Sequence, residues 1–275
     1  MNYADCYKEG AGRLKDCGVR EAELDARLLL EYVCKTDRNT LLAHPERAVS
    51  EEERDRFLAL IARREKREPL QYITGEREFM GLNFETSPET LIPRQDTECL
   101  VEEAMKELHD GMEILDLCCG TGCILLSLLN YSNDCRGFGV DINENAVALA
   151  RKNAENLGIE ARFAVSDLFE AVNGKYDLIT SNPPYIPTQV IVTLDPEVKS
   201  YEPMAALDGG EDGLTFYRVI AAQAKNYLKR GGMIFLEIGY DQGESVSKLL
   251  IENGYKNVKV VKDLAGLDRV VSAYN

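Results

Sequence analysis

The spacing of apolar residues along the chain changes near residue 75. Before that point, apolar side chains recur every three or four positions, which is the period of an amphipathic helix. Ser50 followed by Glu53 predicts a capping box at the start of one such helix, and Pro69 closes the segment. We therefore expect a small all-helical N-terminal domain over residues 1–75.

From about residue 96, short apolar runs alternate with longer amphipathic ones. This alternation predicts strand–helix units and an α/β domain over 96–275, with a Rossmann-like, mostly parallel sheet of seven strands. Between the two regions, residues 76–95 predict a hairpin or linker arm. The last two strands are close enough for an antiparallel hairpin at the sheet edge. Expected strands are 113–118, 136–141, 161–165, 176–181, 232–238, 256–262 and 268–274; expected helices are 95–108, 122–131, 144–157, 213–229 and 242–252.

Composition places the chain among soluble globular proteins. Of its 275 residues 45% are hydrophobic and 29% charged, and no run of 18 or more apolar residues suggests a membrane span. The N-terminus lacks the basic and apolar regions of a secretory signal, so we expect a cytoplasmic protein. In that compartment the eight cysteines are expected to be reduced thiols.

Acidic residues are concentrated in the C-terminal part. Residues 1–75 hold 14 basic and 15 acidic side chains, which leaves 18 basic and 32 acidic for residues 76–275. Because a strongly acidic surface repels polyphosphate, we expect no direct nucleic-acid binding. A protein or a small molecule is the expected partner. Nothing in the pattern indicates assembly, so the expected state is a monomer.

A glycine-containing loop follows the first predicted strand of the sheet domain. Glycines at this place let the backbone approach a ligand beside a helix N-terminus, and Asp141 at the end of the next strand can accept hydrogen bonds from ribose hydroxyls. A dinucleotide fingerprint would need a third glycine where Leu125 stands, which disfavours NAD and leaves S-adenosylmethionine. The loop residues are Cys118, Cys119, Gly120, Thr121 and Gly122.

Two further segments follow later strands at the same edge of the sheet. Asp167 could accept the adenine amino group, with Leu168 and Phe169 covering the ring. Asn182-Pro183-Pro184-Tyr185 follows the fourth strand, and its two prolines remove N–H donors, so the turn favours a planar group that donates hydrogen bonds. An amide NH2 or the amino group of a nucleobase fits this description.

Other arrangements are not favoured. Cys118, Cys119, Cys123 and Cys135 lack the paired spacing of zinc ligands, so no metal is expected. The two histidines, His44 and His109, are interpreted as structural or solvated.

From residue 69 to the end, the chain resembles the glutamine-amide methyltransferases that modify peptide chain release factors. The resemblance is carried by several motifs and is strongest in the arm and in the segment 201–214. Asn182–Tyr185 alone is shared with adenine-specific DNA methyltransferases. The motifs are Pro69–Gly75, Leu91–Arg94 with Thr97-Glu98, the glycine loop, Asn182–Tyr185, Tyr201–Pro203 with Ala206–Gly210 and Asp212–Leu214, Glu237–Gly239, and Asp263–Gly266 with Arg269.

The resemblance implies a methyl transfer from S-adenosylmethionine to the glutamine amide of a Gly-Gly-Gln loop, leaving S-adenosylhomocysteine. It assigns the cofactor to residues 118–122, Asp141, 167–169 and Asn182, catalysis to Asn182, Pro183 and Tyr185, and the substrate to 182–185. The helical domain would bind another part of the release factor. Two departures are Cys118 at a usual glycine position and Leu168 at a frequent tryptophan position.

Three alternatives remain open at this point. The first is an adenine amino-methyltransferase, against which the acidity of residues 76–275 argues. The second is a methyltransferase for a glutamine of some other protein. The third is a non-catalytic cofactor-binding scaffold, which would need neither Asn182–Tyr185 nor Asp141.

Overall fold

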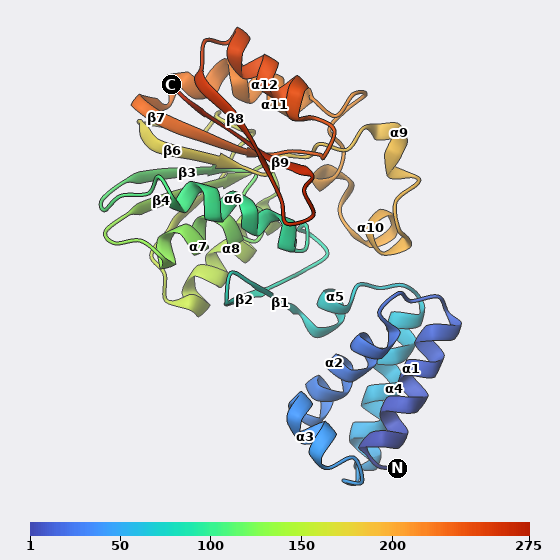
Figure 1. Ribbon diagram of the computed structural model, residues 1–275. Coiled ribbons are helices and arrows are strands. Elements are labelled where there is room, and N and C mark those ends of the chain that lie inside the picture. Colours follow the sequence, from blue (N-terminus) through green and yellow to red (C-terminus); the bar gives the residue numbers. More distant parts are fainter. The chain divides into compact units, whose positions relative to one another are not determined.

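The computed structural model describes every residue from Met1 to Asn275, and its backbone divides into two compact units (Figure 1). The helical unit consists of Met1–Gly75 together with Asp195–Tyr201. The sheet unit consists of Glu76–Leu194 together with Glu202–Asn275. A short segment from the middle of the chain therefore packs with the N-terminal helices. None of the helices has the length and apolar character needed to cross a bilayer.

The helical unit is built around a small apolar core. Leu14, Leu29, Phe57 and Ile61 are fully buried in it. Ser50 accepts a hydrogen bond from the Glu53 backbone N–H, and the Glu53 carboxylate accepts one from the Ser50 N–H, which confirms the predicted capping box. The helices are α1 (Tyr3–Asp16), α2 (Ala22–Cys34), α3 (Arg38–Ala43), α4 (Glu51–Glu65) and α5 (Leu70–Thr74).

Charged groups hold the helix α10 (Pro196–Tyr201) in the helical unit. Glu197 accepts hydrogen bonds from Arg64 at 3.1 Å and from Arg67 at 2.6 and 2.7 Å. Arg64 also donates to Asp25 at 2.7 Å, and both side chains of that pair are more than nine-tenths buried. These hydrogen bonds connect α2, α4 and α10. The chain then continues from α10 into the sheet unit at Glu202.

The sheet unit contains a sheet of seven strands in the order β5-β4-β3-β6-β7-β9-β8. All neighbours are parallel except β9, which runs antiparallel to β7 and β8. The predicted fold class and the antiparallel edge hairpin are confirmed. The strands are β3 (Glu113–Leu117), β4 (Arg136–Asp141), β5 (Arg162–Val165), β6 (Tyr176–Ser181), β7 (Leu228–Glu237), β8 (Lys256–Lys262) and β9 (Asp268–Tyr274).

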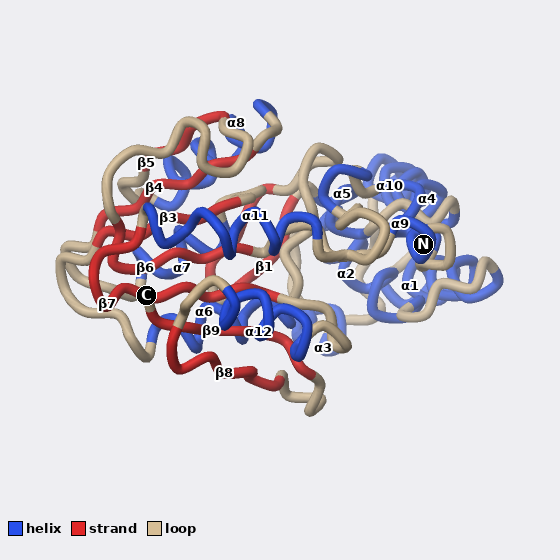
Figure 2. The backbone as a smooth tube through the Cα atoms, turned by 90° about the horizontal axis from the view of Figure 1, so that it is seen from above, coloured by secondary structure: helices blue, strands red, loops and turns tan.

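Helices cover both faces of this sheet (Figure 1). One apolar layer lies under α11 and α12, and the other under α6, α7 and α8. Figure 2 looks onto the first of these faces, where α11 and α12 lie over the strands. The helices are α6 (Gln95–Met105), α7 (Cys123–Asn130), α8 (Glu144–Leu157), α9 (Thr188–Ile191), α11 (Thr215–Gln223) and α12 (Gly243–Glu252), with short 3₁₀ turns at Met204–Ala206 and Ala224–Asn226.

A two-stranded hairpin opens the sheet unit, as predicted for the segment after residue 75. Its strands are β1 (Glu76–Phe79) and β2 (Leu82–Glu85), joined by Met80 and Gly81. Both turn residues have positive φ, 50° and 72°, which matches the twist of a two-residue hairpin turn. Phe79 and Phe84 bury this hairpin against the layer under α6 to α8.

The sequence placed the end of one helix and the start of the following strand wrongly. The expected helix 213–229 ends at Gln223, and the strand expected from 232 begins at Leu228. Leu228 is buried and pairs with Tyr176 of β6, so strand pairing overrides the helical spacing of apolar residues at this place.

Candidate active site

The loop from β3 to α7 has an unusual backbone. Cys118, Gly120 and Gly122 all lie in the left-handed region, with φ of 57°, 52° and 80°. Glycine adopts this region freely, but a residue with a Cβ is strained there by about 1–2 kcal/mol. Cys118 therefore occupies a position that requires a positive φ without having glycine's freedom. The fold therefore retains strain in this loop, as is common at functional sites.

Asp141 at the end of β4 stabilises this loop. Its Oδ2 accepts the Gly120 N–H at 2.9 Å, and its Oδ1 accepts the Asn143 N–H at 2.9 Å. Burial raises the pKa of the Asp141 carboxyl above its usual value, against the effect of these backbone donors. Each carboxylate oxygen keeps a second lone pair, so the side chain can also accept hydrogen bonds from a ligand.

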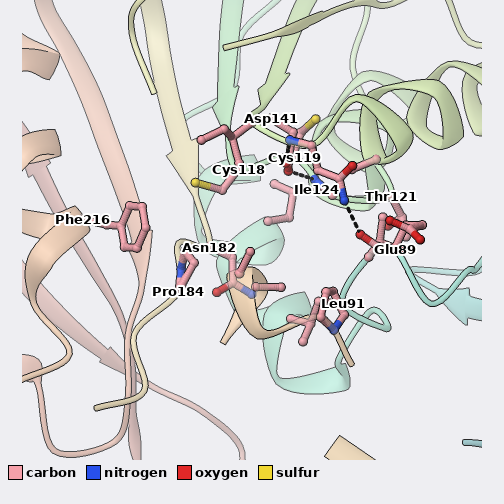
Figure 3. A pocket seen from close by; sticks show the side chains of 18 of the residues that line it. Glu89, Leu91, Cys118, Cys119, Thr121, Ile124, Asp141, Asn182, Pro184 and Phe216 are labelled. Carbon is pink, nitrogen blue, oxygen red and sulfur yellow. Dashed lines mark hydrogen bonds between the residues drawn. The ribbon is translucent and has the colours of Figure 1, made fainter. Parts of the chain in front are cut away.

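A pocket of about 510 Å³ opens at the carboxyl ends of the parallel strands (Figure 3). This is the edge at which open α/β sheets bind their ligands, and the volume is within the range of small-molecule sites. All of its lining residues belong to the sheet unit. The sequence-predicted residues in the lining are Cys118, Cys119, Gly120, Thr121, Asp141, Asp167, Leu168, Asn182 and Pro184.

Four residues predicted for the site do not line this pocket: Gly122, Phe169, Pro183 and Tyr185. Phe169 is 2% exposed, and its ring stacks on Tyr227 with centroids 4.7 Å apart. It belongs to the core and is not part of the pocket lining. Gly122 precedes α7 and faces inward, where a Cβ would lie 3.2 Å from that of Ala150.

The side chains of Leu168 and Phe169 lie on different sides of a tight turn. Leu168 has a φ of 46°, and its carbonyl accepts a hydrogen bond from the Ser166 hydroxyl at 2.9 Å. The same hydroxyl accepts the Ala171 N–H at 2.9 Å. This left-handed turn places Leu168 in the lining of the pocket while its neighbour enters the core.

The turn after β6 is held from behind by polar contacts. The Asn182 Nδ2 donates to the Thr97 hydroxyl at 3.3 Å. The Tyr185 hydroxyl donates to Glu237 at 3.4 Å, and Gln242 donates to the Tyr185 carbonyl at 2.9 Å. Tyr185 packs against the core and is not part of the pocket lining.

The cysteines of the glycine loop are neutral thiols. Burial raises the pKa of Cys118 and Cys119 above the usual range, and that of Cys123 to about 12. All eight cysteines of the chain are free. No cluster of three His, Cys, Asp or Glu side chains is arranged to hold a metal ion.

Several lining residues come from segments that the sequence did not assign to the site. Phe216 at the start of α11 supplies an aromatic face, and Figure 3 shows its ring on the same side of the cavity as Pro184. Leu91 and Thr97 belong to a motif of the resemblance, which was the available signal for them. Glu89 precedes that motif. The Glu89 carbonyl accepts a hydrogen bond from Asn143 at 3.0 Å.

Fold and site together define the class of the protein. A doubly wound sheet with an antiparallel final hairpin and a nucleoside-sized pocket at its carboxyl edge is the architecture of Rossmann-like methyltransferases. A methyltransferase of Pyrococcus furiosus shares the fold, with a TM-score of 0.53 and 19% identity over 70% of this chain and 89% of that one. Residues 95–194 match the "Methyltransferase small domain" family.

Residues 5–75 match the family described as "PrmC N-terminal domain". The release factor glutamine methyltransferase of Agrobacterium fabrum is 43% identical over 268 residues, covering 94% of this chain and 93% of its own. That of Clostridium botulinum is 43% identical over 280 residues and covers 99% of both chains. The protein therefore belongs to the release factor glutamine methyltransferase family, and it is a methyltransferase. The predicted family is confirmed.

Proposed function

We propose that this protein methylates the side-chain amide nitrogen of the glutamine in the Gly-Gly-Gln loop of peptide chain release factors, with S-adenosylmethionine as the methyl donor. The observation that carries the proposal is the position of Asn182. It lines the same pocket as the glycine loop and Asp141, and its NH2 is engaged by Thr97. Its carbonyl oxygen is therefore the group that can accept a hydrogen bond inside the pocket.

The residues present fit S-adenosylmethionine. Asp141 retains lone pairs for two ribose hydroxyls, and Asp167, which is exposed in the pocket wall, can accept the adenine amino group. Leu168 offers an apolar surface for the adenine ring, while Cys119, Gly120 and Thr121 lie beside the N-terminus of α7. When bound, S-adenosylmethionine supplies an electrophilic methyl group on a sulfonium and leaves as S-adenosylhomocysteine.

An amide nitrogen is a weak nucleophile because its lone pair is delocalised into the carbonyl. Asn182 Oδ1 accepts one N–H of the substrate amide, and the Pro183 carbonyl is the proposed acceptor of the other. These two contacts orient the nitrogen toward the methyl group and stabilise the positive charge that develops on it. The nitrogen becomes acidic only as the new N–C bond forms, so its proton departs without a strong general base.

The helical unit is proposed to bind a second part of the release factor. Its compact form and its own core support the proposal of a separate recognition module. Contacts outside the loop should lower KM for the folded factor relative to a short Gly-Gly-Gln peptide, while kcat stays similar. Steady-state kinetics on both substrates measures this, and equal KM values would contradict a second contact.

A labelling experiment tests the function itself. The enzyme is incubated with methyl-labelled S-adenosylmethionine and, in separate reactions, with a bacterial release factor, with its Gly-Gly-Ala loop variant, and with double-stranded DNA. We expect label in the intact factor alone. Label in DNA would indicate a nucleobase amino-methyltransferase, and label in the loop variant would indicate another residue of the factor. No label in any reaction would indicate another protein substrate or a non-catalytic scaffold.

A further inference from the structure

A buried carboxylate lies behind the Asn182 turn. Glu237 at the end of β7 is 1% exposed, and its Oε2 has no hydrogen-bond partner. Its Oε1 is within reach of the Tyr185 hydroxyl, and its backbone carbonyl accepts the Tyr217 hydroxyl at 2.7 Å. Arg269 is close enough to act on it electrostatically but hydrogen-bonds to Asp263 instead. A buried acid without an ion-pair partner is costly, which suggests a role beyond stability.

Thr97 connects this carboxylate to Asn182. Thr97 lies in the first turn of α6, is 2% exposed and also lines the pocket. Its Oγ1 accepts the Asn182 Nδ2–H at 3.3 Å, and its hydroxyl is close enough to the Glu237 carboxylate to lower the pKa of that acid. The three side chains come from α6, β7 and the turn after β6, so the tertiary fold alone brings them together.

The chemistry of a hydroxyl fixes the direction of this chain of hydrogen bonds. A threonine hydroxyl has one proton, and an ionised carboxylate can only accept it. Once that proton is donated to Glu237, Thr97 Oγ1 can only accept, and the Asn182 group that it binds must be the NH2. The Asn182 carbonyl oxygen is then left facing the pocket. The opposite orientation would present an NH2 to the NH2 of the substrate, where neither could accept.

We propose that Thr97 and Glu237 are positioning residues that set the orientation of the Asn182 amide. This inference rests on the proposed function, because it concerns the acceptor that binds the substrate amide. Neither residue contacts the reacting atoms. Thr97 holds the Asn182 NH2, and Glu237 ensures that Thr97 accepts instead of donating.

Two substitutions of Thr97 separate an orienting hydroxyl from a packing role. Thr97→Val keeps the shape and removes the hydroxyl, whereas Thr97→Ser keeps the hydroxyl and removes a methyl group. On a Gly-Gly-Gln peptide, we expect Thr97→Val to lower kcat about 10-fold to 100-fold, and Thr97→Ser to stay within about 3-fold of the wild type. The Kd for S-adenosylhomocysteine, measured by calorimetry, should change less than about 2-fold in both variants.

A double-mutant cycle completes the test. Adding Thr97→Val to Asn182→Ala should cause no further loss of kcat, because the side chain to be oriented is already absent. Independent, multiplicative losses would overturn the proposal, as would an unchanged kcat in Thr97→Val or an equal loss in Thr97→Ser. Thermal melting identifies a variant that fails to fold, and then Thr97→Ser and Glu237→Gln supply the comparison. Glu237→Gln should lower kcat more than the cofactor affinity, and equal losses in both would also contradict the proposal. If the wild type does not methylate the peptide, the proposed function itself is wrong. That result is distinct from a failure of the Glu237–Thr97–Asn182 relay, by which we mean the positioning of Asn182 by Thr97 and Glu237.

Discussion

The two units differ in whether all of their buried acids have an ion-pair partner. In the helical unit, Asp25 and Glu197 are both hydrogen-bonded to Arg64, and Glu197 also binds Arg67 through both of its oxygens. In the sheet unit, Asp116 and Glu237 are fully enclosed, and each leaves one carboxylate oxygen without a partner. Burial raises the pKa of both acids to about 7. Paired charges join helices in the helical unit, whereas the sheet unit combines ion pairs such as Arg94–Glu202 with two enclosed acids that have none.

Backbone strain shows the same contrast. In the helical unit, the non-glycine residues with positive φ are Lys35 and Arg67, which follow the ends of α2 and α4. Such residues are common where helices end. In the sheet unit five non-glycine residues have positive φ, and two of them, Cys118 and Leu168, line the pocket. In the helical unit these strained residues therefore lie just beyond helix ends, whereas two of those in the sheet unit lie in the pocket lining, where the surroundings hold them in place.

The largest expected effect concerns the charge network of the helical unit. Arg64→Met removes a buried cation and leaves Asp25 without its partner, which should destabilise this unit by about 3–5 kcal/mol. The matched control is Arg13→Met, since the Arg13–Glu65 pair is partly exposed at 35% and 23% and such pairs contribute about 1 kcal/mol or less. Urea unfolding measures both. Similar losses in the two variants would show that burial does not distinguish the pairs.

The second prediction concerns turnover. Asn182→Ala removes the carbonyl acceptor that stabilises charge only as the methyl group is transferred, so kcat should fall about 100-fold to 1,000-fold. The Kd for S-adenosylhomocysteine should change little, because Asp141 and the glycine loop are intact. Single-turnover kinetics and calorimetry measure the two quantities. A parallel loss of cofactor affinity would assign Asn182 to cofactor binding instead.

The third prediction concerns pH. Glu237 has a folded-state pKa of about 7, above its ordinary 4.5, so its contribution to stability is present below pH 4.5 and lost as the pH rises to about 7. Glu237→Gln should reduce the slope of unfolding free energy against pH in this window by up to about 1.4 kcal/mol per unit. Asp116 titrates in the same direction, so part of the slope remains. An unchanged slope would contradict a titrating Glu237.

The same titration should appear in catalysis. The relay needs an ionised Glu237, so kcat should fall as the pH drops below about 7 and approach tenfold per pH unit. The groups acting on this carboxyl are Thr97 and Asp96 on α6, Arg269 on β9 and the Tyr185 hydroxyl, with the Tyr217 hydroxyl on its backbone carbonyl. A flat kcat profile between pH 5 and 8 in the wild type would contradict this dependence.

The smallest expected effect isolates the strain at Cys118. Cys118→Gly and Cys118→Ala both remove the thiol, so comparing them cancels its packing and its contact with Ser181. The glycine variant should be the more stable by about 1 kcal/mol, because only glycine adopts a φ of 57° freely. Equal unfolding free energies would mean that the loop relaxes to a different backbone conformation.

Local patterns were enough to predict the sheet and the residues at its edge. The carboxyl ends of parallel strands lie at the same edge of a sheet, regardless of the helices that connect them. Asp141, Asp167 and Asn182 each follow such a strand, so the sequence was enough to place them together. The side on which a neighbouring residue lies could not be predicted. Leu168 lines the pocket and Phe169 enters the core because the turn between them is left-handed.

Contacts between residues far apart in the sequence could not be predicted from local sequence patterns either. Phe216 is almost a hundred residues from the glycine loop, and no spacing rule places it in the pocket. The segment 195–201 looks like an ordinary connection in the sequence, and its place among the N-terminal helices depends on Glu197 contacting Arg64 and Arg67. The Glu237–Thr97–Asn182 relay similarly depends on three elements that meet only in the folded chain.

The chemical identity of the methylated atom decides whether the enzyme modifies a glutamine amide. After transfer of a labelled methyl group to a release factor, complete acid hydrolysis converts an N-methylated glutamine amide to glutamate and labelled methylamine. We expect the label to be recovered as methylamine, and none to be recovered from the Gly-Gly-Ala variant. Recovery as methanol, which indicates a carboxylate ester, or as an N-methylated amino acid would contradict it.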